Sequence, residues 1–225
     1  FLNAVSLIPI LFAYAKMNVN TPVIQETNKK PLHEIREGIS EARKNPIIFG
    51  NLLAAGIVSS LILNMGTYGP LFADRVLHKG LDGFGSILFA AGAGSMASGI
   101  LSATSSTHYS QRFIFTAAGL CGLLLMAVSY IFWTIPALFM FALLGFATIL
   151  FMVNCNTAIQ MASPPEYLGR IMGLYTFVFL GSAPFGSLLV SAIIEYMGTS
   201  LGLAIVGLFE IILILLTAKT YSKQK

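Results

Sequence analysis

Charged residues are scarce in this sequence. They make up 10% of the 225 residues, whereas hydrophobic residues make up 56% and the mean hydropathy is +0.81. A typical soluble domain carries about 25% charged residues. The charges also leave long gaps, since none lies between Lys44 and Asp74 or between Arg112 and Glu166. This composition excludes an ordinary soluble domain and indicates a membrane protein.

Cysteine and histidine are also rare, with two and three residues respectively. The cysteines do not cluster at the spacing of metal ligands, and no HExxH motif occurs. Cys121 and Cys155 lie in long apolar runs, where cysteine behaves as a small apolar residue. We therefore expect no enzymatic activity, no cofactor and no metal site.

The gaps between charges are long enough to cross a lipid bilayer. A helix needs about 20 apolar residues to traverse about 30 Å of hydrocarbon. Strands of a membrane barrel would instead alternate polar and apolar residues over about 10 positions, which these runs do not. The sequence therefore predicts an all-α fold, a polytopic membrane helix bundle over 47–218, with spans at 47–70, 83–104, 112–132, 136–160, 168–192 and 199–218.

The distribution of lysine and arginine predicts the orientation of this bundle. An even number of spans puts both flanks on one side, and that side carries eleven Lys and Arg residues. The opposite side carries only Arg75 and Lys79. By the positive-inside rule, the flanks of a multi-pass protein of the cell membrane are then cytoplasmic. The net charge of +4 follows from this asymmetry and requires no nucleic-acid partner.

The segments before and after the six spans have their own predicted structures. Residues 1–15, "FLNAVSLIPILFAYA", are apolar but too short to span, and we interpret them as the tail of a preceding helix in a larger protein. Residues 16–46 form a predicted cytoplasmic linker, and 219–225 a cytoplasmic tail. Within the linker, the spacing of Leu32, Ile35, Ile39 and Ala42 predicts an amphipathic helix, lying against the membrane or the bundle or simply solvated.

Polar side chains inside the spans are costly in lipid and are therefore candidates for function. For the amides, the alternative is hydrogen bonding between helices, worth about 1 kcal/mol each. The one acid, Glu210, has three interpretations: a protonated buried group, a partner for a residue outside this chain, or a proton-binding group. These intramembrane residues are Asn51, Asn64, Asn154, Asn156, Gln160 and Glu210.

Glycine and proline patterns in two of the spans predict features of the backbone. Ala90, Gly94 and Ser98 recur at the spacing that lets membrane helices approach closely. "GAGSMA" in the same span fits a loose dinucleotide fingerprint, but no strand precedes it, and close packing explains it better. In "GSAPFG", Pro184 removes a backbone hydrogen bond, which predicts a kink or soft point.

The segment 154–170, "NCNTAIQMASPPEYLGR", places amides, a double proline and a charge pair after a long apolar run. With the following residues it resembles the major facilitator superfamily, in the branch that contains macrolide-efflux and enterobactin-exporter proteins. "EGISEARKNPII" is similar to the family's approach to its seventh helix. The resemblance extends over essentially the whole chain, is most specific at 160–173, and implies the C-terminal half of a twelve-helix transporter.

The resemblance also implies roles for individual residues. The fourth span would match the helix that faces the family's central cavity, and the substrate cavity would be lined by Asn64, Tyr68, Met152, Asn156 and Gln160. Pro164 would end that helix, while Glu166 and Arg170 would pair or bridge to neighbouring helix ends. With Pro184 they would gate two access states, and Glu210 is a candidate for proton coupling. The loop "SATSSTHYSQRF" lacks the acid that many relatives carry, so no latch is expected there.

These features together predict a secondary active transporter. We expect proton-coupled efflux of amphipathic, drug-like or macrolide-like molecules by alternating access, as in an antiporter that confers drug resistance. A siderophore or metabolite exporter, or a non-transporting scaffold or sensor on the same fold, are the alternatives. The expected partners are the lipid bilayer, a small-molecule substrate and the N-terminal half of the same protein.

Overall fold

The computed structural model describes residues 31–104 and 110–224, without the side chains of 31–35 and 222–224. The predicted tail of a preceding helix, 1–15, and the first half of the predicted linker, 16–30, lie outside the described residues. The same is true of 105–109, in the loop where no latch is expected. Apart from Pro31, the described residues belong to one unit of the fold, Leu32–Lys225.

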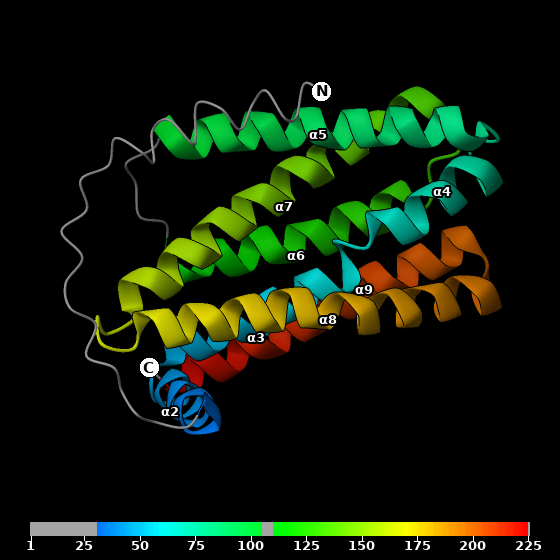
Figure 1. Ribbon diagram of the computed structural model, residues 1–225. Helices are drawn as coiled ribbons and strands as arrows, with labels where there is room; N and C mark the ends of the chain where they lie inside the picture. The colour runs from blue at the N-terminus through cyan, green and yellow to red at the C-terminus, as the bar shows by residue number, and fades with distance from the viewer. Residues whose placement is uncertain (1–30, 105–109, 225) are drawn as a thin grey trace, which may run out of the picture. The chain divides into compact units, whose positions relative to one another are not determined.

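Helices make up nearly all of the described chain, and no strand occurs in it (Figure 1). Within these residues, six stretches are long and apolar enough to cross a membrane, with α3 and α4 counted together. The predicted all-α bundle with six spans is therefore confirmed. The helices are α2 Pro31–Lys44, α3 Pro46–Leu61, α4 Met65–Arg75, α5 Gly80–Thr104, α6 Gln111–Val128, α7 Thr134–Ala162, α8 Leu168–Met197 and α9 Thr199–Gln224.

The first span is interrupted, contrary to the single helix predicted over 47–70. α3 ends at Leu61 and α4 begins at Met65. Asn64 donates from Nδ2 to the carbonyl oxygen of Ser60, and the Tyr68 hydroxyl donates to the carbonyl oxygen of Ile62 at 2.8 Å. These side chains satisfy carbonyl groups that the interrupted helix leaves without backbone donors. An apolar run shows its length but not such an internal break.

α5 and α7 pack with their backbones in direct contact. A Cβ atom added at Gly94 would overlap the carbonyl oxygen of Ala142, and one added at Gly145 would overlap that of Ala91. Ser98 is fully buried on α5. Gly94 and Ser98 of the predicted small-residue pattern thus lie on the inner side of α5, and Ala91 rather than Ala90 meets the glycine of α7.

α3 and α8 pack against each other near Pro184, the predicted soft point of α8. The helix runs unbroken through Pro184, and two residues later a Cβ atom at Gly186 would overlap the backbone of Ser60. The Ser59 hydroxyl donates to the carbonyl oxygen of Phe179, one turn before the proline. The break after α3 and the proline of α8 therefore lie on two helices that touch each other.

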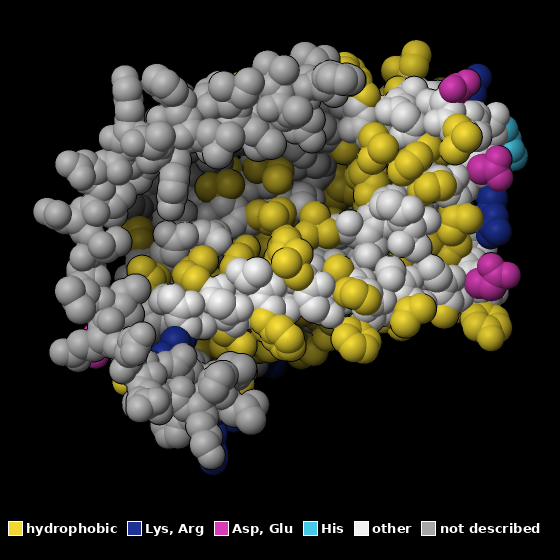
Figure 2. All heavy atoms as spheres, viewed as in Figure 1, with side chains coloured by type: hydrophobic (Ala, Val, Ile, Leu, Met, Phe, Trp, Pro, Cys, Tyr) yellow, Lys and Arg dark blue, Asp and Glu magenta, His cyan; other side chains and the backbone are white. Residues whose placement is uncertain are grey.

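Hydrophobic side chains are spread over the part of the face in Figure 2 that is not grey, and most of the visible charged side chains gather at the end where α4 finishes and α5 begins. α5 and α8 are the least covered of the six spans, because only 17% of the most apolar part of each is buried within the described chain. A surface this apolar requires lipid or another protein segment against it. The largest exposed side chains of these two helices include Phe89 and Met96 on α5 and Phe177, Phe185 and Leu188 on α8.

Candidate functional site

Three side chains of α7 form the strongest candidate site, which we call the amide stripe: Met152, Asn156 and Gln160. They are four residues apart and therefore lie on one face of the helix. Met152 and Asn156 are half-buried, and Gln160 is exposed. Gln160 donates from Nε2 to Oδ1 of Asn156, which joins the two amides into one polar group. The stripe thus presents hydrogen-bonding groups on a span that is otherwise apolar.

An aromatic pair on α8 extends the amide stripe. Tyr175 is buried (8% exposed) beside Asn156, and its ring stacks on that of the half-buried Phe179 with centroids 5.8 Å apart. Tyr175 was not among the site residues predicted from the sequence, although a phenol within an apolar helix is a detectable signal. Amides beside Met and aromatic rings form the kind of surface that binds molecules with apolar and polar parts.

The third amide of α7, Asn154, occupies a different face. It is half-buried, and its Nδ2 donates to the carbonyl oxygen of Leu150 at 2.7 Å within its own helix. Such a local bond satisfies the amide without a partner from outside. Asn154 is therefore separate from the amide stripe and provides a natural control for it.

Two of the residues predicted to line the cavity are buried within the described chain. Tyr68 is fully buried and Asn64 is 9% exposed, and both are bonded to backbone carbonyls at the break between α3 and α4. Neither presents its polar group on an open surface of the described chain. Their observed contacts hold the shape of the first span, and their place in the cavity stays a prediction.

Asn51 forms a second polar contact between helices. Its side chain and that of Gln111 exchange two hydrogen bonds, of 2.9 and 3.0 Å, and Asn51 also donates to the carbonyl oxygen of Ile47. Asn51 is fully buried. The sequence offered helix-to-helix hydrogen bonding as one interpretation of this amide, and the structure supplies Gln111 of α6 as its partner.

The turn between α7 and α8 contains three of the predicted gating residues. α7 ends at Ala162, Pro164 lies in the turn, and Glu166 is exposed. Arg170 donates from Nη1 to Oε2 of Glu37 at 2.6 Å, so it bridges to α2 rather than pairing with Glu166. Of the two contacts expected for Arg170, the bridge to a neighbouring helix is the one observed.

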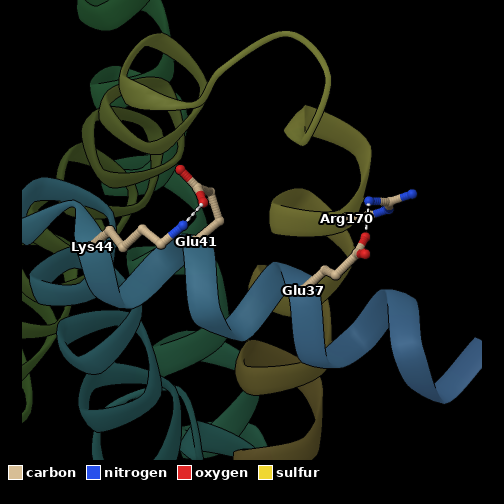
Figure 3. A network of polar contacts seen from close by, with 4 residues as sticks. All are labelled: Glu37, Glu41, Lys44 and Arg170. Atoms are coloured by element: carbon tan, nitrogen blue, oxygen red, sulfur yellow. Dashed lines mark hydrogen bonds and ion pairs between the residues drawn. The ribbon is translucent and has the colours of Figure 1, made fainter.

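Figure 3 shows how α2 is held at this end of the bundle. Its buried side faces the bundle through Ala42, and Glu37 reaches Arg170 of α8. On the same helix, Nζ of Lys44 donates to Glu41 at 2.8 Å, and this hydrogen bond raises the pKa of Lys44. The amphipathic helix of the predicted linker therefore lies against the bundle, which was one of the arrangements that the sequence left open.

Removing the bridge to α2 is expected to weaken the fold at this end. Arg170→Gln should lower the free energy of unfolding by about 1 kcal/mol, because the side chains of Arg170 and Glu37 are each only about a quarter exposed. Glu41→Gln, which removes the more exposed pair within α2, should cost only a few tenths of that. Thermal unfolding of the detergent-purified protein measures both, and equal losses would contradict a special role for the bridge.

Glu210 is buried between α6 and α9. It is fully shielded from solvent, and neither carboxyl oxygen has a hydrogen-bond partner of good geometry among the described residues. The carboxyl group lies against Gly122, where an added Cβ atom would overlap Oε2. An ionised carboxylate without a counter-charge is unfavourable there, so the site accommodates the neutral acid best.

The described residues show neither a metal site nor a hydrolase motif in its usual setting. No group of three His, Cys, Asp or Glu side chains converges there on a metal site. A short match to the GxSxG motif occurs at 198–202, with the half-buried Ser200 as its serine, but it spans the turn from α8 into α9. Because a nucleophile elbow follows a strand and this turn follows a helix, the match does not indicate a hydrolase.

Comparison with known proteins gives one match. A sequence model described as Major Facilitator Superfamily matches residues 1–187, which is most of the chain. No curated protein and no solved structure matched the chain.

Proposed function

The chain belongs to the Major Facilitator Superfamily, a family of membrane transporters, and on this premise we propose that it is a proton-coupled exporter of amphipathic small molecules. Export would proceed by alternating access, with drug-like or macrolide-like compounds as the substrate class. The protein would act as an antiporter of the cell membrane, with its linker and C-terminus cytoplasmic.

The amide stripe is the observation that carries this proposal. Asn156 and Gln160 place a joined pair of amides on a membrane span, with Met152 on the same face. The stacked rings of Tyr175 and Phe179 lie on the neighbouring helix. A site with few fixed hydrogen-bonding groups, placed beside flexible and aromatic apolar side chains, can bind amphipathic molecules of different shapes.

The contacts at the ends of α7 and α8 support alternating access. The Arg170 to Glu37 bridge joins α8 to α2, and an interaction of about 1 kcal/mol is enough to bias a balanced two-state equilibrium. Pro184 lies where α8 contacts the interrupted first span. We propose that Pro164, Glu166, Arg170 and Pro184 belong to the region that changes between the two access states.

The exposed faces of α5 and α8 support a further partner. These two helices are the least covered of the six spans in the described chain, although their exposed side chains are large and apolar. We propose that the N-terminal half of the same protein packs there and completes a cavity along the amide stripe, as pseudo-symmetric transporter halves do.

Efflux from cells that express the full-length gene tests the proposal. A fluorescent amphipathic compound and a labelled macrolide are loaded, and their release is followed before and after an uncoupler collapses the proton gradient. We expect efflux above that of control cells, and its loss on uncoupling. No efflux of either compound from a folded, expressed protein would reject drug export and favour the siderophore, metabolite or scaffold alternatives.

Glu210→Gln is expected to separate coupling from folding. Glutamine has nearly the shape of a protonated glutamate, so the packing against Gly122 should be retained and thermal stability should be unchanged. If Glu210 carries the coupled proton, as we propose, uncoupler-sensitive efflux should fall to the level of uncoupled cells while substrate binding persists. Full energised efflux by the variant would place the proton site elsewhere.

A further inference from the structure

A long groove lies between α6 and α9, apart from the amide stripe. Its volume is about 1250 Å³, and the end of α7 and Ile47 of α3 close its remaining sides. The groove is lined along most of its length by apolar side chains, among them Leu123 of α6 and Ile211 and Leu215 of α9. Leu123 is 49% exposed and Leu215 is 63% exposed, so the groove opens to the surroundings of the described chain.

One end of the groove is polar and basic. Ser110, Gln111 and Arg112, at the start of α6, line it there. Ser110 caps its own helix by accepting a hydrogen bond from the backbone of Phe113, and Gln111 is engaged by Asn51. Arg112 is exposed and has no ion pair among the described residues, and no acidic side chain lines the groove. The groove therefore combines an apolar channel with one unneutralised cation at its end.

Aromatic side chains mark the same end. Tyr221, near the end of α9, lines the groove and packs edge-on against Phe115 with ring centroids 5.8 Å apart. Tyrosine favours the boundary between hydrocarbon and headgroups, because its ring is apolar and its hydroxyl is polar. This places the basic end of the groove at headgroup level and its apolar part within the hydrocarbon.

We propose that this groove binds an anionic phospholipid. The phosphate of the headgroup pairs with the Arg112 guanidinium, and an acyl chain lies along Leu123, Ile211 and Leu215. Arginine matches phosphate geometry through several N–H donors, and basic pockets between membrane helices are suited to anionic headgroups. An uncharged or zwitterionic lipid would fill the apolar part equally well but would leave Arg112 without a net counter-charge.

Fluorescence quenching by brominated lipids tests this in the full-length protein. Trp133 is the only tryptophan of this chain and is replaced in a Trp133→Phe background, with any tryptophans outside this chain replaced likewise. Leu215→Trp then reports from the groove. The protein is reconstituted into phosphatidylcholine bilayers that contain either brominated phosphatidylglycerol or brominated phosphatidylcholine at the same mole fraction. We expect about a fivefold preference for phosphatidylglycerol, the effect of one basic side chain near a membrane surface.

Variants of Arg112 test whether its charge causes the preference for phosphatidylglycerol. Arg112→Gln should abolish it while quenching by brominated phosphatidylcholine persists, which shows that the groove is still present. Arg112→Lys should retain most of it. Arg36→Gln, on α2 and outside the groove lining, is the matched control and should leave it unchanged. Equal quenching by both lipids, no quenching because a second copy of the chain covers the groove, or a preference that survives Arg112→Gln would each overturn the proposal.

Discussion

Gly94→Ala is expected to destabilise the protein by about 1–3 kcal/mol, the usual cost of inserting a methyl group into a packed contact. The added Cβ atom would overlap the carbonyl oxygen of Ala142 on α7. Because the obstacle is backbone rather than a flexible side chain, α5 and α7 must move apart, and both helices lose contacts along their length. Thermal unfolding in detergent, followed by loss of the monodisperse elution peak, measures the effect.

Gly92→Ala on the same helix is the matched control. A Cβ atom at Gly92 would meet nothing within 4 Å, and alanine has the higher helix propensity, so stability should be unchanged or slightly raised. Gly145→Ala, on the other side of the α5–α7 contact, should behave like Gly94→Ala, because its Cβ atom would overlap the backbone of Ala91. If all three variants lost stability equally, helix flexibility rather than close packing would explain the glycines.

Asn156→Ala and Gln160→Ala are expected to reduce transport at least about tenfold without unfolding the protein. Each change removes one partner of the hydrogen-bonded amide pair, and an unpaired polar group facing a substrate in a low-dielectric site costs about 1–3 kcal/mol. Uncoupler-sensitive efflux, normalised to the amount of protein in the membrane, gives the loss. Weaker binding of the same fluorescent substrate to the purified variants would show that the loss of transport arises from substrate recognition.

Asn154→Ala is the control for both changes. It removes the same chemical group from the same helix, but among the described residues its amide donates to Leu150 of α7 alone and lies outside the amide stripe. Transport should therefore remain near the unmodified level. A loss as large as that of Asn156→Ala would indicate that any amide in this helix supports folding, and would remove the evidence for the stripe as a substrate site.

The candidate site was only partly predictable from the sequence. Asn156 and Gln160 are four residues apart, so their common helical face follows from the sequence alone. Tyr175 was missed because its nearness to Asn156 depends on how α7 and α8 cross. The contacts of Asn64 and Tyr68 with backbone carbonyls could not be predicted, because they depend on the break after α3.

The ion-pair partner of Arg170 was also only partly predictable from the sequence. Arg170 has its nearest acid in sequence at Glu166, and a local pair was one of two expectations. Its observed partner is Glu37, which is 133 residues away along the chain. Such a partner depends on where α2 docks, and no local pattern in either segment indicates that.

The sequence by itself determined the membrane character, the six spans and the all-α class, because the length of an apolar run is set directly by the thickness of the bilayer. The tertiary structure alone decided which polar groups meet. The break in the first span, the exchange of hydrogen bonds between Asn51 and Gln111, and the docking of α2 all depend on residues far apart in the chain. In lipid, burial does not distinguish one apolar face from another, so close backbone contacts and polar partners set the arrangement of the helices.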